Sequence, residues 1–345
     1  MVSFRYPVSV VWEITDVCNM MCGHCRASAI KAKVKPNLMD DIILRNILES
    51  KVFAINLSGG EPLLHPDVLR FVKALHEAQI DVCISTNGWF FLDLAEQLIE
   101  AGLNMLQVSI DGPEKLHDSF RGRRSAYQHA VRALKKAVEL GIRTQLNTTI
   151  TSINIDYIEH SVEVARNLGV DRVFYRRIIP YGRSRVNNSL LPNREKYLRC
   201  ITDLSMLDVD GPKISIDDPV LNVLRLPKES NVIGCGAGIK SLGISCHGEV
   251  FPCIFFREKI GTLKEKSLIE IWQHSDVLRR LRNREIKVCG MCQHKERCGG
   301  CRAYSGMFNR DSLCPLDCMA DGHLTNFSTG NGLQCSIQRE RMQSV

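Results

Sequence analysis

The chain has 345 residues, of which 44% are hydrophobic and 24% charged, with a formal net charge of +7 and 15 cysteines. This length allows more than one domain, and the composition is that of a folded, soluble protein. No apolar run approaches the roughly 20 residues that span a bilayer, and the first residues lack a signal-peptide pattern. So many cysteines without an export signal indicate a reducing, cytoplasmic location and metal or redox chemistry. No basic stripe with interleaved aromatic residues favours nucleic acid, and neither nucleic acid nor membrane is expected as a partner.

Three cysteines at CxxxCxxC spacing follow the β-prone run Val8–Thr15: Cys18, Cys22 and Cys25. So short a loop cannot bury three thiols as ordinary core, and the pattern predicts a metal site. A [4Fe–4S] cube has four iron corners, so three cysteines leave one iron open to a substrate or cofactor. The alternative is a zinc knuckle with a distant fourth ligand such as His24.

Six β-prone runs alternate with helical patterns up to about residue 180. The expected strands are Val8–Thr15, Val52–Leu57, Asp81–Ser85, Leu103–Ile110, Ile142–Ile150 and Val170–Ile179. The helices expected between them are Asp40–Ser50, Val68–Ala78, Leu92–Ala101, Ala126–Leu140 and Ile155–Leu168. Short β-then-α repeats form right-handed crossovers, so we predict an α/β fold with a parallel sheet, curved into a partial (β/α)6, TIM-like barrel.

Polar and glycine-rich stretches follow the expected strands. They are the cysteine loop, Gly59–Pro62, Thr86–Gly88, Ser109–Gly112 and Tyr181–Arg183. Parallel barrels carry their chemistry at the carboxyl ends of the strands. The sequence therefore predicts one functional site at that rim, built from all five stretches.

The cysteine loop and the Gly59-Gly60-Glu61-Pro62 stretch resemble the radical S-adenosylmethionine (SAM) superfamily. Ser109–Gly112 and His117–Gly122 extend the resemblance through the barrel. It implies an enzyme whose three loop cysteines hold a [4Fe–4S] cluster with SAM chelated at the open iron. It also implies that an electron from the cluster cleaves SAM to a 5′-deoxyadenosyl radical, which abstracts a hydrogen from the substrate.

The resemblance also implies which residues bind SAM: His24, Gly59, Gly60, Glu61, Pro62, Ser109 and Asp111. The two glycines let backbone approach the methionine part, and Glu61 offers a carboxylate to its ammonium. Pro62 fixes the turn, and the backbone of His24 meets the adenine. Ser109 and Asp111 are candidates for ribose or substrate contacts; the alternative for Asp111 is a turn with Gly112.

A second cysteine-rich region begins after residue 230. Its nine cysteines are Cys235, Cys246, Cys253, Cys289, Cys292, Cys298, Cys301, Cys314 and Cys318. A zinc knuckle would explain the two CxxC pairs taken alone, but nine thiols exceed the ligands of one zinc ion. The order of a first cysteine, Gly-x4-Cys, CxxC, x5, CxxC and a final cysteine resembles the SPASM domain, which holds auxiliary iron–sulfur clusters.

By that resemblance the region binds one or two auxiliary [4Fe–4S] clusters. The first ligand set implied is Cys289, Cys292, Cys298 and either Cys314 or Cys318. The second set implied is Cys235, Cys253 and Cys301, with or without Cys246. Without Cys246, one iron of that second cluster stays open to the substrate.

These patterns predict four parts of the chain: a radical SAM barrel over 1–190, a bridging helix and linker over 191–230, a SPASM domain over 231–320 and a polar tail over 321–345. Arg194–Leu207 is the expected bridging helix, and Lys213–Ile216 is expected to extend the sheet. In the SPASM region Leu268–Arg282 has the spacing of one amphipathic helix.

The first expectation for function is modification of an unactivated C–H position in a ribosomally made peptide, giving a cross-link, an oxidation or an epimer. The alternative is tetrapyrrole side-chain modification in an alternative haem pathway, because Trp12–Thr15 and Cys25–Ala29 resemble that branch. The distant alternative is a non-catalytic iron–sulfur or zinc protein, which would not need the Gly59–Glu61 turn.

Two kinds of partner are expected. An acidic electron donor such as a flavodoxin or ferredoxin would suit the mild positive charge. Four arginines near the last barrel strand are candidates to bind carboxylates of either substrate, or else form a solvated face: Arg176, Arg177, Arg183 and Arg185.

Overall fold

The structure is a computed structural model, and it describes residues 4–224, 234–306 and 311–314. Cys318 and the predicted tail over 321–345 lie outside the described residues. The strands are β1 Ser9–Thr15, β2 Ala54–Gly59, β3 Asp81–Thr86, β4 Met105–Ser109, β5 Arg143–Ile150, β6 Arg172–Arg177, β7 Lys213–Asp217, β8 Ser241–Ile244, β9 Glu249–Phe251 and β10 Gly261–Thr262. The α-helices are α1 Leu38–Glu49, α2 Val68–Glu77, α3 Phe91–Glu100, α4 Glu114–Arg121, α5 Ala126–Glu139, α6 His160–Leu168, α7 Arg194–Met206, α8 Leu221–Leu224, α9 Leu268–His274, α10 Asp276–Arg282 and α11 Arg302–Ser305.

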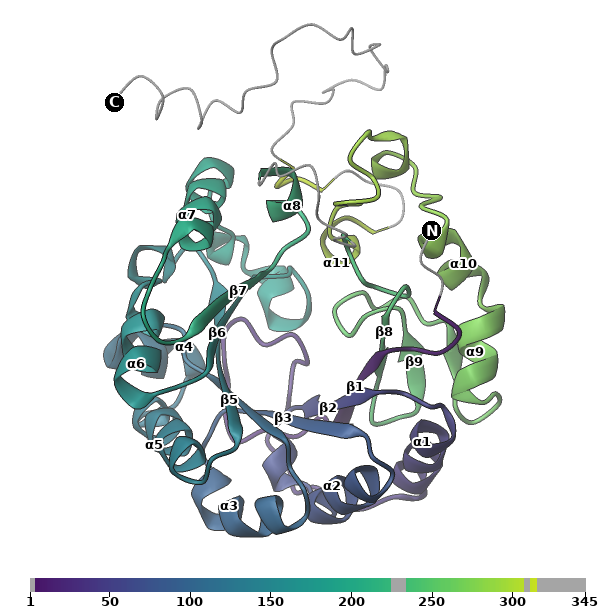
Figure 1. The fold of residues 1–345 in the computed structure, drawn as a ribbon, viewed down its shortest axis with the longest axis horizontal. Helices are drawn as coiled ribbons and strands as arrows, with labels where there is room; N and C mark the ends of the chain where they lie inside the picture. The colour runs from purple at the N-terminus through teal and green to yellow at the C-terminus, as the bar shows by residue number, and fades with distance from the viewer. Residues whose placement is uncertain (1–3, 225–233, 307–310, 315–345) are drawn as a thin grey trace, which may run out of the picture.

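All ten strands form one sheet in the order β10-β9-β8-β1-β2-β3-β4-β5-β6-β7. Strands β1 to β7 pair in parallel in chain order, and the helices that connect them lie on the outside of the curved sheet (Figure 1). The predicted six β/α units and partial barrel are confirmed. The extra strand expected at Lys213–Ile216 is also present, as β7.

The first hairpin of the cysteine-rich C-terminal region continues the barrel sheet. Strand β8 pairs in parallel with β1, from Ser9 opposite Ser241 to Trp12 opposite Ile244, and β9 then turns back antiparallel to β8. The pairing covers the outer edge of β1, which would otherwise expose a row of unpaired backbone groups.

Side chains alternate along the strands between an apolar outer face, which packs against the helices, and a polar inner face. In β1, Trp12 and Ile14 are fully buried against the helices, whereas Glu13 belongs to the opposite face. On the inner face, Ser85 of β3 lies within hydrogen-bond distance of the side chains of Asn56 in β2 (3.0 Å) and Gln107 in β4 (2.7 Å). The barrel interior is therefore lined by polar groups suited to a polar ligand.

Two helices differ from the sequence expectation. The single helix predicted over Leu268–Arg282 is wrong: Ser275, with φ −69° and ψ 123°, ends α9 and caps α10 by accepting a hydrogen bond from the N–H of Leu278. The helix α4, which ends at the left-handed Gly122 (φ 63°), was not predicted because its eight residues are largely polar.

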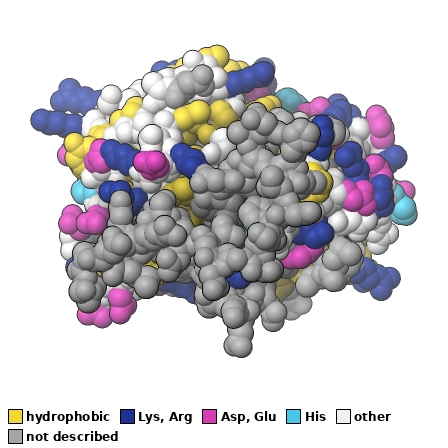
Figure 2. Space-filling view, turned by 90° about the horizontal axis from the view of Figure 1, so that it is seen from above, with side chains coloured by type: hydrophobic (Ala, Val, Ile, Leu, Met, Phe, Trp, Pro, Cys, Tyr) yellow, Lys and Arg dark blue, Asp and Glu magenta, His cyan; other side chains and the backbone are white. Residues whose placement is uncertain are grey.

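On the face seen from above, the described Lys and Arg side chains alternate with Asp and Glu along the margins (Figure 2). Within the described part of the chain, no helix combines the length and apolar character that crossing a membrane requires.

A buried ion-pair network ties the end of the barrel to the C-terminal region. Arg177 at the end of β6 donates to Asp218, Nε to Oδ2 at 2.7 Å, and to Asp311, Nη1 to Oδ1 at 2.7 Å. Tyr197 of α7 donates its hydroxyl proton to the same Asp218. Arg177 was one of the four arginines proposed for substrate, but its side chain is only 2% exposed and its charge is already paired.

We expect Arg177→Met to lower the free energy of unfolding by about 3–5 kcal/mol, because it leaves two buried carboxylates without their cation. Chemical denaturation of the reduced apoprotein measures this difference. The matched control is Arg172→Met at the other end of β6, where no ion pair is present among the described residues, with an expected change below about 0.5 kcal/mol. Equal changes in both variants would contradict the structural role of Arg177.

Candidate functional site

The predicted cysteine loop leaves the carboxyl end of β1 and is closed at its base by backbone hydrogen bonds. The N–H of Cys18 donates to the oxygen of Ile30 at 2.9 Å, and the N–H of Ile30 donates to the oxygen of Asp16 at 3.1 Å. In Figure 1 the loop is the purple segment that crosses the ring of strands. Cys18 and Cys22 are buried, and Cys25 is half-buried.

The three thiols fit a site for a cationic cluster. Burial, followed by the carboxylate of Glu61, raises the pKa of the Cys18 thiol to about 12, and Cys22 and Cys25 add to this shift. Burial likewise raises the pKa of Cys22. Three neighbouring thiols, two of them buried, become thiolates readily only where bound metal supplies positive charge. Cys18, Cys22 and Cys25 would hold such a cluster, which supplies the electron for reductive chemistry.

Arg183 holds the loop over the barrel. Its Nε donates to the oxygen of Cys22 and its Nη1 to the oxygen of Ala29, both at 2.8 Å, while its backbone N–H donates to the oxygen of Cys25 at 2.9 Å. Arg183 was also proposed as a carboxylate ligand for the substrate. In the structure its guanidinium instead donates hydrogen bonds to backbone carbonyls of the cysteine loop.

The turn after β2 is hydrogen-bonded to the base of the cysteine loop. Gly60 donates to Thr15 at 2.7 Å and Glu61 donates to Val17 at 2.8 Å, backbone to backbone. A Cβ on Gly59 would lie 2.2 Å from the oxygen of Thr15, and one on Gly60 would lie 2.1 Å from that of Val17. The glycines therefore permit close approach of two backbone segments, a reason that the sequence analysis did not give.

Glu61 is buried with its carboxylate oriented by three donors. It accepts hydrogen bonds from the Thr86 hydroxyl at 2.6 Å, the Asn87 N–H at 2.8 Å and the Leu63 N–H at 3.1 Å. Burial raises its pKa to about 7, against the opposing effect of these hydrogen bonds. Pro62 begins a short 3₁₀ turn, as the expected turn requires. A fixed carboxylate beside Cys18 is an acceptor placed for an ammonium group.

The carboxylate of Asp111 is hydrogen-bonded to Arg121, which in turn contacts the cysteine loop. Its Oδ2 accepts from Nε and Nη2 of Arg121 at 2.7 and 2.6 Å, and its Oδ1 accepts from the N–H of Thr149 at 3.1 Å. Arg121 in turn hydrogen-bonds the Cys22 thiol. These hydrogen bonds orient the Asp111 carboxylate, and its expected contact with ribose or substrate stays a prediction. Ser109 lies on the inner face of β4 with Gln107, and its contact with a ligand stays a prediction.

His24 stacks on Phe120 of α4, with ring centroids 4.1 Å apart. Its Nε2 lies 3.9 Å from Asp111, its Nδ1 is buried without a hydrogen-bond partner in the described residues, and burial lowers its pKa to about 3. The imidazole is therefore neutral, which does not favour His24 as a partner for an anion. The contact of its backbone with adenine stays a prediction.

Two residues of the site were missed because their neighbours in space are far away in sequence. Arg121 reaches Cys22 from α4, and Asn87 from the β3 end lies with its Nδ2 3.8 Å from the Sγ of Cys18. The signal available in the sequence was their position inside the stretches Thr86–Gly88 and His117–Gly122.

The cysteines of the C-terminal region fall into two groups. One group lines a small cavity that also contains Asp311, and its members are Cys289, Cys292, Cys298 and Cys314. The other group consists of Cys235, Cys253 and Cys301, in which the Cys235 thiol lies close enough to add to the burial that raises the thiol pKa of both Cys253 and Cys301. These groups coincide with the two ligand sets that the resemblance implies; the ligation itself stays a prediction.

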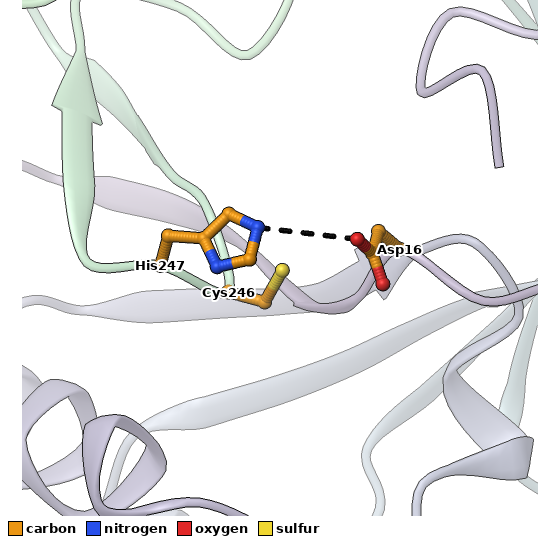
Figure 3. A group of neighbouring side chains, drawn as sticks. All are labelled: Asp16, Cys246 and His247. Carbon is orange, nitrogen blue, oxygen red and sulfur yellow. Dashed lines mark ion pairs between the residues drawn. The ribbon is translucent and has the colours of Figure 1, made fainter. Parts of the chain in front are cut away.

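Cys246 lies apart from both groups, at the turn between β8 and β9 (Figure 3). Its Sγ, a carboxylate oxygen of Asp16 and a ring nitrogen of His247 all lie within 4.8 Å of one another. Burial and then the carboxylates of Asp16 and Glu13 raise the pKa of its thiol to about 12. The expectation that Cys246 is a fourth ligand of the second set therefore finds no support in its surroundings.

We expect Gly60→Ala to reduce iron incorporation at the cysteine loop and to destabilise the protein by about 1–3 kcal/mol, because the new Cβ would overlap the oxygen of Val17. Iron analysis and thermal unfolding after anaerobic reconstitution measure both effects. The matched control is Gly23→Ala in the same loop, where the added Cβ meets nothing within 4 Å. A control that loses as much iron would show that the loop tolerates no side chain at all.

We expect Cys246→Ser to retain the iron content of the unmodified protein, whereas Cys253→Ser loses iron from the second cysteine group. The reason is that the neighbours of Cys246 are Asp16 and His247 instead of cysteines. Iron and sulfide analysis of the two reconstituted variants makes the comparison. A matching loss in both would place Cys246 among the ligands.

The sequence model of the Radical SAM superfamily matches residues 12–168, and that of the SPASM iron–sulfur cluster-binding domain matches residues 235–301. An AdoMet-dependent heme synthase of Methanosarcina barkeri is 29% identical over 86% of this chain and 91% of its own length. The mycofactocin maturase MftC of Mycolicibacterium smegmatis is 28% identical over 86% of this chain and 78% of its own.

Among solved structures, Streptococcus suis SuiB bound to S-adenosylmethionine superposes with a TM-score of 0.70 at 20% identity, over 90% of this chain and 78% of SuiB. At that identity the likeness shows a shared fold. The two matched domains imply [4Fe–4S] clusters and SAM as cofactors. The chain therefore belongs to the radical SAM superfamily, as an enzyme with a C-terminal SPASM domain.

Proposed function

We propose that the chain cleaves SAM reductively and abstracts a hydrogen from a side chain of a carboxylate-bearing tetrapyrrole. The observation that carries the SAM part is the Glu61 carboxylate, which three donors hold in one orientation beside Cys18. Cys18, Cys22 and Cys25 would hold the cluster, which would supply the electron for cleavage of SAM to the radical.

The protein's own residues position the cofactor and exclude water. Glu61 presents a carboxylate to the SAM ammonium, and Arg183 fixes the loop carbonyls of Cys22 and Ala29. Arg121 places positive charge against the Cys22 thiolate and is itself held by Asp111.

The choice of a tetrapyrrole rests on relatives named for haem chemistry. Besides the Methanosarcina barkeri protein, the pre-heme d1 synthase of Dinoroseobacter shibae is 28% identical over 84% of this chain. The Trp12–Thr15 and Cys25–Ala29 stretches also resemble that branch. Peptide modification is the second candidate, favoured by the likeness to the mycofactocin maturase. We assign electron delivery to an acidic flavodoxin or ferredoxin, on the strength of the net charge of +7.

We expect the anaerobically reconstituted enzyme to convert SAM with dithionite to 5′-deoxyadenosine and methionine, measured by liquid chromatography. Glu61→Gln should weaken SAM binding about tenfold and leave iron content unchanged, because a charge-assisted hydrogen bond to the ammonium is lost. The Cys18/Cys22/Cys25→Ala triple variant, which removes the loop thiolates, should form no 5′-deoxyadenosine.

The contrary outcomes are distinct. Absence of 5′-deoxyadenosine from the unmodified enzyme would rule out both enzyme functions. Normal SAM affinity in Glu61→Gln would show that the ammonium binds elsewhere. Substrate choice is read by adding either a porphyrin with free propionates or a candidate precursor peptide and following the mass of each; a mass change in the peptide alone would favour the second candidate.

A further inference from the structure

Three arginines from three separate segments meet at the mouth of the barrel. Glu13, at the end of β1, receives hydrogen bonds from Arg26 of the cysteine loop and from Arg257, which follows β9; the Nη2 of Arg257 lies 2.5 Å from its Oε2. Burial favours the protonated glutamate, but the two guanidinium groups outweigh it and lower the pKa of Glu13. One carboxylate thus holds two cations in place.

The ring of Phe255 joins a third arginine to this group. The guanidinium carbon of Arg26 lies 5.2 Å from the ring centroid, and that of Arg176 lies 4.4 Å from it. Arg176 belongs to the face of β6 opposite to Tyr175, whose side chain is buried against the outer helices. Alternation along the strand therefore directs Arg176 toward the barrel interior.

The group lies between the two kinds of cysteine site. Arg26 directly follows Cys25 of the SAM loop. Phe255 donates its backbone N–H to the Sγ of Cys253 at 3.5 Å, and Arg176 is close enough to lower the pKa of the Cys253 thiol against the effect of burial. A substrate that contacts both the SAM loop and the auxiliary cysteines would therefore lie against these arginines.

The charges in the group do not balance. Arg176 pairs with Asp217 of β7 through two hydrogen bonds of 2.9 and 2.7 Å, and Glu13 serves both of the other arginines. Three guanidinium groups therefore face two carboxylates. The side chains of Arg176 and Asp217 are 33% and 53% exposed, and the buried Nε of Arg257 has no hydrogen-bond partner within the described residues. An additional anion would complete the set.

We propose that Arg26, Arg176 and Arg257, together with the ring of Phe255 that Arg26 and Arg176 contact, form the site that binds the carboxylates of a planar tetrapyrrole substrate. The inference rests on the proposed function and names the residues that select its substrate. Guanidinium groups bind carboxylates through paired hydrogen bonds, and an aromatic ring between them offers a flat apolar surface to a macrocycle. Arg176 makes the direct contact, while Glu13 is a positioning residue. Asp217 competes with the substrate for Arg176.

The test compares a porphyrin carrying four free propionates with its tetramethyl ester, using the reconstituted holoenzyme and the shift of the porphyrin absorption band. We expect the free acid to bind at least tenfold more tightly than the ester. Arg176→Gln should weaken acid binding about tenfold without changing ester binding, and Arg176→Lys should restore part of the loss. Asp217→Asn should tighten acid binding several-fold, since it frees Arg176.

Arg172→Gln is the matched control, because Arg172 lies at the opposite end of the same strand and has no ion pair in the described part of the chain. It should bind both porphyrins as the unmodified enzyme does. Asp217→Asn guards against misfolding, because a misfolded variant does not gain affinity. Equal binding of acid and ester, or unchanged or weaker acid binding by Asp217→Asn, would overturn the site. Formation of 5′-deoxyadenosine without any porphyrin tests the proposed SAM chemistry separately, so either can fail alone.

Discussion

The contact on which the site depends is a backbone contact between two turns. The N–H groups of Gly60 and Glu61 donate to the carbonyls of Thr15 and Val17, at the point where β1 becomes the cysteine loop. This pairing continues the β1–β2 ladder beyond the strands and orients the loop before any side chain acts. Since the same turn carries the Glu61 carboxylate, the acceptor for a ligand and the thiols for a cluster share one backbone frame.

Two arginines also hold the cysteine loop in position, one through hydrogen bonds to its backbone and one through its charge. Arg183 satisfies carbonyl oxygens of the loop, which a chain crossing the barrel mouth leaves without partners. Arg121 neutralises charge at Cys22 and is balanced by Asp111. Arg183 contacts the backbone of the cysteine loop, whereas Arg121 contacts the Cys22 thiol itself. Their removal would alter the cluster environment through position and charge together.

The sequence was sufficient for features that depend on local pattern. The six β/α units follow from hydrophobic periodicity and glycine stops, and the two cysteine groups match the sets that the resemblance to the SPASM domain implies. Features that depend on distant partners were not accessible: β8 pairs with β1 across more than two hundred residues. The break at Ser275 was missed because apolar spacing continues across it, while the backbone turns to follow the curved surface.

The different roles of Arg176 and Arg177 could not be predicted from the sequence. Arg177 and Arg176 are adjacent on β6, yet the alternation of the strand buries the first among Asp218 and Asp311 and leaves the second at the barrel interior. Both side chains carry the same charge and each pairs with an aspartate, but the face of the strand decides that the Arg177 pair is fully buried and the Arg176 pair is partly exposed. A two-residue period is visible in sequence, but which face is the interior is fixed by the packing of Tyr175 and its neighbours against the helices.

Strand β1 also explains why the two cysteine sites have a defined relation to each other. Its carboxyl end leads into the SAM loop, and its outer edge pairs with β8, whose hairpin carries Cys253, Phe255 and Arg257 close behind. Rigid sheet hydrogen bonds, in place of a flexible hinge, thus set the separation between loop and hairpin. Glu13, at the end of that strand, binds one arginine from each side. The substrate position that we infer is accordingly the place where β1 brings the radical-generating half and the auxiliary half of the enzyme together.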